Sequence, residues 1–133
     1  MSKYDHQNRR KYSLKVHIVL VTKYRKNIIT DKIKDSLKKA VLDISQKYNY
    51  KILAMETDIN HIHILLEYDT VVSVSDIVKK IKQSTTFYLW GLCRTELSMH
   101  YWSKHIFWSD GYFACSIGEV SAKTIQQYIE NQD

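Results

Sequence analysis

The apolar and polar positions along the chain follow two different periods, which predict an ordered series of strands and helices. Residues 14–22 are mostly apolar and β-branched, a composition typical of a central strand. Other segments place apolar residues at the three- and four-residue spacing that marks one face of a helix. In chain order, the predicted strands are 14–22, 51–57, 61–67 and 112–117, and the predicted helices are 31–48, 73–94 and 121–132.

Residues that favour caps and turns support these boundaries. Thr30 can cap the first helix, and either Ser73 or Ser75 can cap the second, because a hydroxyl at the cap can accept a hydrogen bond from a free amide of the first turn. The polar connection 58–60 predicts a hairpin between the second and third strands. The segment 95–108 is rich in aromatic residues but has no clear period, so no element is predicted there.

The element order β-α-β-β-α-β, followed by a helix, predicts an α+β fold. This order is the ferredoxin-like (RRM-like) split βαβ layout, in which one antiparallel sheet carries two helices on the same face. The opposite face is left for a ligand, a partner or an additional element. The length of 133 residues matches one domain, which we divide into a core at 14–118 and a terminal helix at 121–132.

Composition narrows the class of protein. A hydrophobic content of 44% supports a packed core, and the absence of proline together with only 3 glycines excludes collagen-like and low-complexity classes. No apolar run reaches the roughly 20 residues needed to cross a bilayer, and the basic N-terminal segment does not resemble a secretory leader. Cys93 and Cys115 form no metal or disulfide pattern, so we expect two buried thiols in a reducing cytoplasm.

The net charge of +6 is distributed unevenly. Residues 1–52 carry 14 Lys and Arg against 4 Asp and Glu, a balance of +10, whereas residues 53–133 have a balance of −4. A basic half favours a polyanionic partner, most commonly a nucleic acid. A lysine-rich helix face that is merely solvated would give the same charge, and charge alone does not separate the two.

Two histidines on one strand are the first candidates for chemistry. Alternation along 61–67 places Ile62, Ile64 and Leu66 on the core face, and therefore His61 and His63 on the open face, about 7 Å apart at Cα. Two imidazoles so placed can converge on one metal ion, although they could also be hydrogen-bonded surface histidines. Two ligands are too few for a closed zinc site. An open divalent site beside a basic surface fits phosphodiester chemistry.

A tyrosine on the last helix is the candidate nucleophile. The chain has neither a phosphate-binding glycine loop nor a nucleophile-elbow motif, and it has 10 tyrosines. Tyr128 and Gln132 are four residues apart and share a helix face, so the Gln132 amide oxygen could ligate the same metal. Helical periodicity alone favours the alternative, in which Tyr128 packs at the helix margin.

Several segments, in the same order, resemble the single-tyrosine HUH transposases of the insertion-sequence 200/605 family. Residues 60–66 carry the His–hydrophobic–His (HUH) motif, and residues 128–132 read Tyr-x-x-x-Gln. The remaining likeness is to the family's first strand, its basic turn, its second helix and the segment before its tyrosine helix, at residues 16–19, 22–26, 78–82, 107–113 and 116–118. The resemblance covers residues 14–132, with Asn60 at a position where the family suggests an acidic residue.

This resemblance implies an enzyme that cuts and rejoins single-stranded DNA at the ends of a mobile element. His61, His63 and Gln132 would hold Mg²⁺ or Mn²⁺. Tyr128 would attack the scissile phosphate and form a 5′-phosphotyrosine link. The partners implied are DNA hairpins and a second copy of the chain, in a homodimer whose subunits can share active sites.

Basic and aromatic side chains supply candidate DNA contacts. The candidates for phosphate binding are Lys23, Arg25, Lys26, Lys79, Lys80 and Lys82. Tyr24, Phe87, Tyr88 and Trp90 could stack on unpaired bases, or pack in the core or in a dimer. Three other functions remain open: a host-serving HUH nuclease acting on palindromic repeats, a non-catalytic ferredoxin-like nucleic-acid binder, and a small-molecule-binding dimer.

Overall fold

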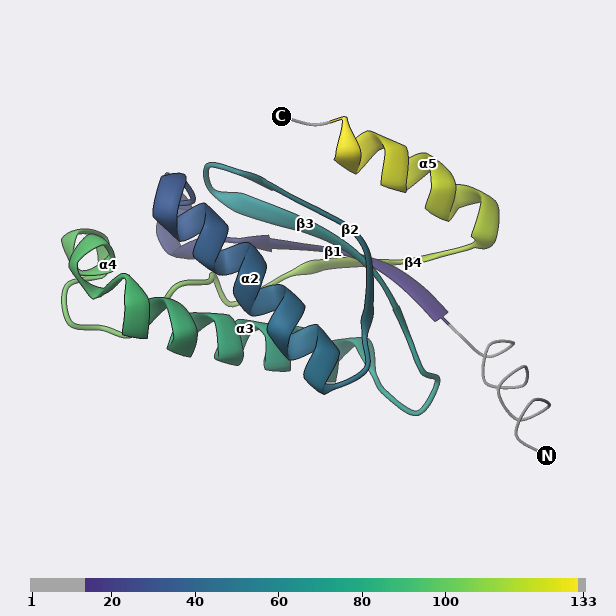
Figure 1. The fold of residues 1–133 in the computed structure, drawn as a ribbon, viewed down its shortest axis with the longest axis horizontal. Coiled ribbons are helices and arrows are strands. Elements are labelled where there is room, and N and C mark those ends of the chain that lie inside the picture. Colours follow the sequence, from purple (N-terminus) through teal and green to yellow (C-terminus); the bar gives the residue numbers. More distant parts are fainter. Residues whose placement is uncertain (1–13, 132–133) are drawn as a thin grey trace.

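A four-stranded antiparallel sheet forms the centre of the molecule. The computed structural model describes residues 14–131 and gives the strand order β2-β3-β1-β4 (Figure 1). The strands are β1 (Leu14–Val21), β2 (Lys51–Asp58), β3 (His61–Tyr68) and β4 (Phe113–Ile117). The helices are the short 3-10 turn η1 (Lys23–Arg25), α2 (Asp31–Lys47), α3 (Val74–Leu92), α4 (Arg94–Tyr101) and α5 (Glu119–Glu130).

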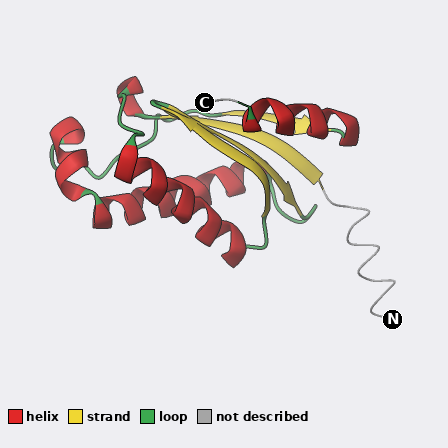
Figure 2. Cartoon of the chain, turned by 45° about the horizontal axis from the view of Figure 1, so that its top comes forward, coloured by secondary structure: helices red, strands yellow, loops and turns green. Residues whose placement is uncertain are grey.

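The helices form layers on both faces of this sheet. Helices α2 and α3 cover one face, and α5 lies on the other (Figure 2). This arrangement confirms the predicted α+β, ferredoxin-like fold and shows that α5 occupies part of the face that the sequence left open. None of the helices within residues 14–131 is both long and apolar enough to span a membrane.

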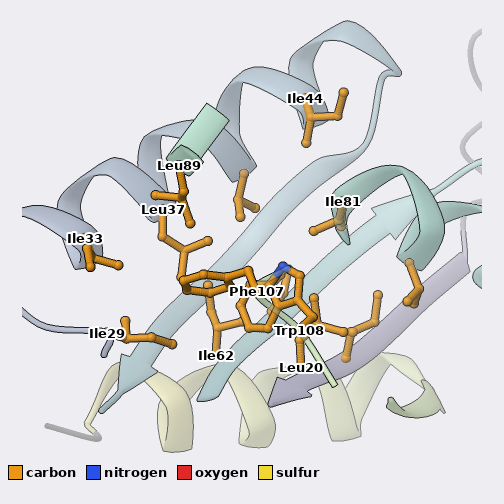
Figure 3. Close-up of a cluster of buried hydrophobic side chains, with 14 of the residues drawn as sticks. Leu20, Ile29, Ile33, Leu37, Ile44, Ile62, Ile81, Leu89, Phe107 and Trp108 are labelled. Atoms are coloured by element: carbon orange, nitrogen blue, oxygen red, sulfur yellow. The ribbon is translucent and has the colours of Figure 1, made fainter. Parts of the chain in front are cut away.

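Alternation along β3 separates the core face from the open face, as predicted, and β1 follows the same alternation. Ile18 pairs with Ile64 and Leu20 pairs with Ile62, and all four side chains are fully buried under the helices. Figure 3 shows this core, where Phe107 also lies among side chains from the sheet and the helices. The apolar faces of α2 and α3 are therefore buried against the face of the sheet that carries Ile62 and Ile64, as predicted.

The aromatic segment 95–108, for which no element is predicted, contains a helix. Residues 94–101 form α4, which was not predicted because it buries only two side chains, Leu97 and Tyr101. The Tyr101 hydroxyl donates a hydrogen bond to the Lys23 carbonyl at 2.8 Å, and burial raises the pKa of this phenol to about 12. The Trp108 indole nitrogen donates to Thr85 Oγ1 at 2.9 Å. Long-range partners therefore order this segment.

Three smaller predictions concern helix caps and the two cysteines. Of the two candidate caps of α3, Ser73 is the one used, because its hydroxyl accepts a hydrogen bond from the Asp76 amide at 3.1 Å. Thr30 precedes α2, but its side chain makes no capping hydrogen bond. Cys93 is buried as expected, whereas the expectation for Cys115 was wrong, because β4 is an edge strand and leaves this thiol exposed.

Candidate active site

His61 and His63 lie on the open face of β3, where alternation places them. Both are half-buried, and their ring centroids are 5.0 Å apart with the ring planes at 76°. Between them, the Ile62 side chain points into the core and is fully buried. The apolar register of β3 thus fixes the two imidazoles on one side of the sheet.

Asn60 orients the first imidazole. Its side-chain Oδ1 lies 2.8 Å from His61 Nδ1, so the ring places a proton on Nδ1 and donates to the amide oxygen. The second ring nitrogen, Nε2, then carries the lone pair. Asn60 stands where the family suggests an acidic residue. Its amide oxygen accepts the same hydrogen bond that a carboxylate at this position could accept.

A third histidine, which sequence reasoning missed, orients the second imidazole. His17 Nε2 on β1 lies 3.1 Å from His63 Nδ1, and the two rings stack with centroids 5.3 Å apart at 12°. Burial, followed by the charges of His61 and His17, lowers the pKa of His63 to about 4, and burial also lowers the pKa of His17. Alternation along β1 could have placed His17 on the open face. Its hydrogen bond to His63, however, depends on the β1–β3 register, which the sequence does not specify.

These two histidines fit the chemistry of metal ligands. His63 is neutral at pH 7 because of its low pKa, and a neutral imidazole is the form that binds a divalent cation. Each ring has its Nδ1 engaged by a neighbour, which leaves Nε2 for coordination. Among residues 14–131 there is no set of three His, Cys, Asp or Glu side chains placed to hold a metal. The predicted third ligand, Gln132, lies outside the described residues.

Helix α5 brings Tyr128 to the same face of the sheet. Ile129 is fully buried in a small cluster with Leu65 of β3 and Ala54 of β2. The Gln126 side-chain amide also donates to the Leu53 carbonyl at 3.2 Å. Leu65 is two residues from His63, a distance of about 7 Å along a strand, so the last turn of α5 lies beside the histidine pair.

The Tyr128 side chain itself faces solvent. It is 65% exposed on the flank of α5, and within the described chain neither a ring contact nor a hydrogen bond joins it to His61 or His63. The structure thus brings the helix and the histidines together without placing the phenol on them.

The basic candidates at the end of β1 lie close to the histidines. The Thr22 amide donates to the Asn60 carbonyl at 2.9 Å, which joins the turn 22–26 to the start of β3. Tyr24 and Arg25 have φ values of 61° and 51°, a left-handed conformation that is costly for residues other than glycine. The turn holds both side chains exposed, beside Lys23 and Lys26.

The three lysines of α3 that are candidates for phosphate binding have different surroundings. Lys79 is exposed, and Lys80 forms an ion pair with Asp76 at 2.5 Å. The Lys82 ammonium donates to the carbonyls of residues 109, 110 and 111 at 2.8–3.1 Å, and burial lowers the pKa of Lys82. These three hydrogen bonds use its three donors on the turn before β4. DNA binding by all six basic residues stays a prediction.

Taken together, the fold and the site define a ferredoxin-like protein with an HUH histidine pair beside a tyrosine-bearing terminal helix. Comparison with known proteins agrees with this class: the family model described as "Transposase IS200 like" matches residues 10–132. The chain belongs to this family, that of the IS200/IS605 transposases. Membership makes it a DNA-processing enzyme of the kind carried by mobile elements.

Curated relatives span nearly the whole chain. The ISDra2 transposase TnpA of Deinococcus radiodurans is 26% identical over 121 residues, covering 91% of this chain and 85% of that protein. The transposase for insertion sequence element IS200 of Salmonella typhimurium is 30% identical over 122 residues, covering 92% and 78%. The family match over residues 10–132 includes both the HUH strand and Tyr128.

Solved structures share the fold. A Deinococcus radiodurans R1 protein assigned as a transposase has a TM-score of 0.73 at 29% identity, with 91% of this chain and 92% of that chain covered. A REP-associated tyrosine transposase bound to a REP hairpin has a TM-score of 0.65 at 14% identity, covering 87% and 64%. At 14% identity, the second likeness is one of fold alone.

Proposed function

We propose that this protein cleaves and rejoins single-stranded DNA at insertion-sequence ends, with Tyr128 as the nucleophile. The observation that supports this most strongly is the docking of α5 through Ile129 onto Leu65, two residues from His63. This contact brings the only tyrosine of the last helix to the side of the sheet that carries both histidines. Family membership supports the same chemistry for both motifs.

The covalent step balances without an external energy source. The phenolic oxygen of Tyr128 attacks phosphorus, and the bond from phosphorus to the 3′ oxygen breaks. The phenol gives up its proton as it attacks, the departing 3′ oxygen takes up a proton, and the 5′ phosphate remains esterified to Tyr128. Attack by another 3′-hydroxyl reverses these steps, so one phosphodiester bond replaces another and ATP is not required.

His61 and His63 are proposed to hold the cofactor, Mg²⁺ or Mn²⁺, together with Gln132. A bound divalent ion would act as a Lewis acid on the scissile phosphate. Asn60 and His17 contribute by holding the two rings in one orientation, through the hydrogen bonds described above. A preorganised pair loses little conformational entropy when the ion and the phosphate bind.

We also propose that the active unit is a homodimer that binds DNA hairpins. Strand β4 pairs only with β1, so within the described chain its second edge is unpaired, and Phe113 on this strand is 56% exposed. An open edge with exposed apolar side chains favours pairing with a second copy. Among the described residues, Tyr128 makes neither a ring contact nor a hydrogen bond with His61 or His63 of its own subunit, which supports a site shared between subunits.

Two observations support the proposal of hairpin binding: the positive charge of the turn 22–26 and the hairpin bound by a protein of the same fold. The basic turn 22–26 lies beside the histidines and presents cations to a DNA backbone. The REP-associated relative was solved with a REP hairpin, which makes a hairpin a reasonable substrate to test here. The DNA of a mobile element resides in the cytoplasm of a bacterium or archaeon, where we place the reaction.

One experiment tests the proposal directly. The protein is incubated with hairpin-bearing single-stranded DNA and Mn²⁺, and the products are separated under denaturing conditions. We expect a covalent protein–DNA adduct that Tyr128→Phe abolishes, while hairpin binding by the variant remains. Adducts that persist in Tyr128→Phe would show that the nucleophile is wrong. Tight, metal-independent binding with no adduct from the wild-type protein would instead indicate a non-catalytic DNA binder.

A further inference from the structure

A second candidate site lies on the helical side of the sheet. A groove of about 610 Å³ runs between α3 and the segment 105–110, and we call it the α3 groove. Its lining includes Lys82, Gln83, Phe87, Gly91, Arg94 and His105. Because α3 covers the face opposite α5, this groove is separate from the histidine pair.

The floor of the α3 groove is aromatic and rigid. The Trp90 indole nitrogen donates to the Ile106 carbonyl at 2.9 Å, and the His105 ring stacks on Trp90 at 4.5 Å and 16°. Beside this stack, Phe87 is 85% exposed, which is unusual for a phenylalanine on a well-packed helix. A β-carbon built on Gly91 would meet no atom within 4 Å, so the groove is open above the helix backbone there.

The rim of the α3 groove favours an anion. Arg94 is exposed and lies 6.0 Å from the Trp90 ring centroid, with its guanidinium 3.4 Å from His105 Nε2. Asp110 is the one carboxylate among the groove's lining residues, and it forms an ion pair with Lys23 at 3.2 Å. The Gln83 amide, which offers both a donor and an acceptor, lines the same groove.

Backbone pairing connects this rim to the catalytic end of the sheet. The Ser109 amide donates to the Val21 carbonyl at 2.8 Å, and Val21 pairs with His61. The rim is therefore two strand spacings, or roughly 10 Å, from the backbone of His61. A DNA strand that passes over the basic turn 22–26 would reach the groove within a few nucleotides.

We propose that the α3 groove binds an unpaired nucleotide of the DNA substrate, with its base against Phe87 and its phosphate at Arg94. An exposed aromatic ring, an amide for base edges and a nearby guanidinium are the groups that bind single-stranded DNA. A second copy of this chain fits less well, because each copy carries a net charge of +6 and Arg94 requires an anion. This inference rests on the proposed function, since it assigns a subsite to the same substrate.

The test compares two DNA probes and four variants. The probes are a DNA hairpin with a single-stranded tail and the same hairpin without the tail. Phe87→Ala removes a ring that is 85% exposed, and Gly91→Leu fills the groove at a position where an added β-carbon meets no atom within 4 Å. Arg94→Met removes the cation. Leu42→Ala, at a half-exposed apolar position on α2, is the matched control.

Loss of stacking should weaken binding of the tailed probe. We expect Phe87→Ala and Gly91→Leu to raise its Kd roughly 5- to 150-fold, with little change for the tail-less hairpin or for Leu42→Ala. Arg94→Met should lower the slope of log K against log salt by about one. Bromouracil in the tail should photocrosslink to the peptide containing residues 87–94.

Failure of the groove assignment can be distinguished from failure of the proposed function. If the wild-type protein forms Tyr128 adducts but Phe87→Ala and Gly91→Leu bind both probes normally, the groove assignment is wrong and the proposed function stands. If crosslinks map to the groove but no adduct forms, the groove stands and the transposase chemistry fails. If Phe87→Ala changes only the sedimentation of the dimer, the groove is a subunit interface and the inference is overturned.

Discussion

His63 Nδ1 lies 3.1 Å from Nε2 of His17, on the neighbouring strand of the sheet. For His63 to offer the Nε2 lone pair to a cation, its proton must sit on Nδ1, and His17 Nε2 is the acceptor for that proton. The hydrogen bond thus selects the tautomer of His63 that can bind metal. His17 is a positioning residue in this site, because it acts through His63.

Removal of this acceptor should weaken metal binding. We expect His17→Ala to lower Mn²⁺ affinity about 10- to 100-fold, and His17→Gln to recover much of the loss because its amide oxygen can accept the same hydrogen bond. Calorimetric titration of the free protein with Mn²⁺ measures this directly. Cys115→Ala is the control, since Cys115 pairs with His17 across the β1–β4 register. Unchanged Mn²⁺ affinity in His17→Ala would remove the positioning role.

The two HUH histidines should be required for cleavage but not for DNA binding. We expect His61→Ala and His63→Ala each to lose Mn²⁺-dependent cleavage of hairpin-bearing DNA, because each removes a proposed ligand. Their affinity for the hairpin should stay within about twofold of wild type, since phosphate contacts provide most of the binding. His100→Ala, on α4, is the matched control. Undiminished cleavage in either variant would show that the metal assignment is incorrect.

The docking of α5 should depend on one buried side chain. Ile129 belongs to a small hydrophobic cluster that is separate from the main core, so Ile129→Ala should destabilise the docked helix by about 2–4 kcal/mol. Hydrogen exchange of α5 amides should then accelerate roughly 30-fold or more, while α2 and α3 keep their protection. Ile125→Ala, at a half-buried position, should have a smaller effect. Equal acceleration in all helices would mean that α5 is not an independent unit.

Two lysines on α3 should behave differently although both are candidates for DNA contact. Lys79 is exposed, so Lys79→Gln should lower the salt slope of DNA binding by about one with an unchanged Tm. Lys82→Met removes three hydrogen bonds to the turn 109–111, so it should lower the Tm by roughly 3–8 °C. Thermal unfolding and binding measured at several salt concentrations separate these effects. A stable Lys82→Met protein with a reduced slope would place Lys82 on the DNA.

Acid should remove a contribution from the ion pair between Lys38 and Glu56. Burial raises the pKa of Glu56, but the hydrogen bond from Lys38 at 2.6 Å and that from the Thr57 amide outweigh it and lower the pKa overall. A lowered carboxyl pKa stabilises the fold above the unfolded value of about 4.3 and ceases to do so as pH falls through the folded pKa.

Lys38→Met should therefore cost about 1 kcal/mol of unfolding free energy at pH 7 and much less at pH 3. Urea unfolding at the two pH values provides the measurement. Lys39→Met is the control, because Lys39, one position along α2, forms a solvent-exposed ion pair with Asp43. The same loss for Lys38→Met at both pH values would contradict the assignment of this pair.

Features that depend on local periodicity were predictable from the order of the amino acids. Alternation along β3 placed His61 and His63 on one face, and the three- and four-residue spacing gave the buried stripe of α2. The HUH and Tyr-x-x-x-Gln motifs were also visible in sequence, and they sufficed for the family. Such features repeat over two to four residues, so short segments contain all the information needed to predict them.

Contacts between residues far apart in the chain became known from the folded molecule. The β1–β3 register set His17 against His63, and Tyr101 ordered α4 through a hydrogen bond to a residue far away in the chain. The α3 groove likewise exists because the segment 105–110 packs beside α3. The physical reason is that register and packing depend on contacts between segments distant in sequence, and a local hydrophobic pattern does not specify these contacts.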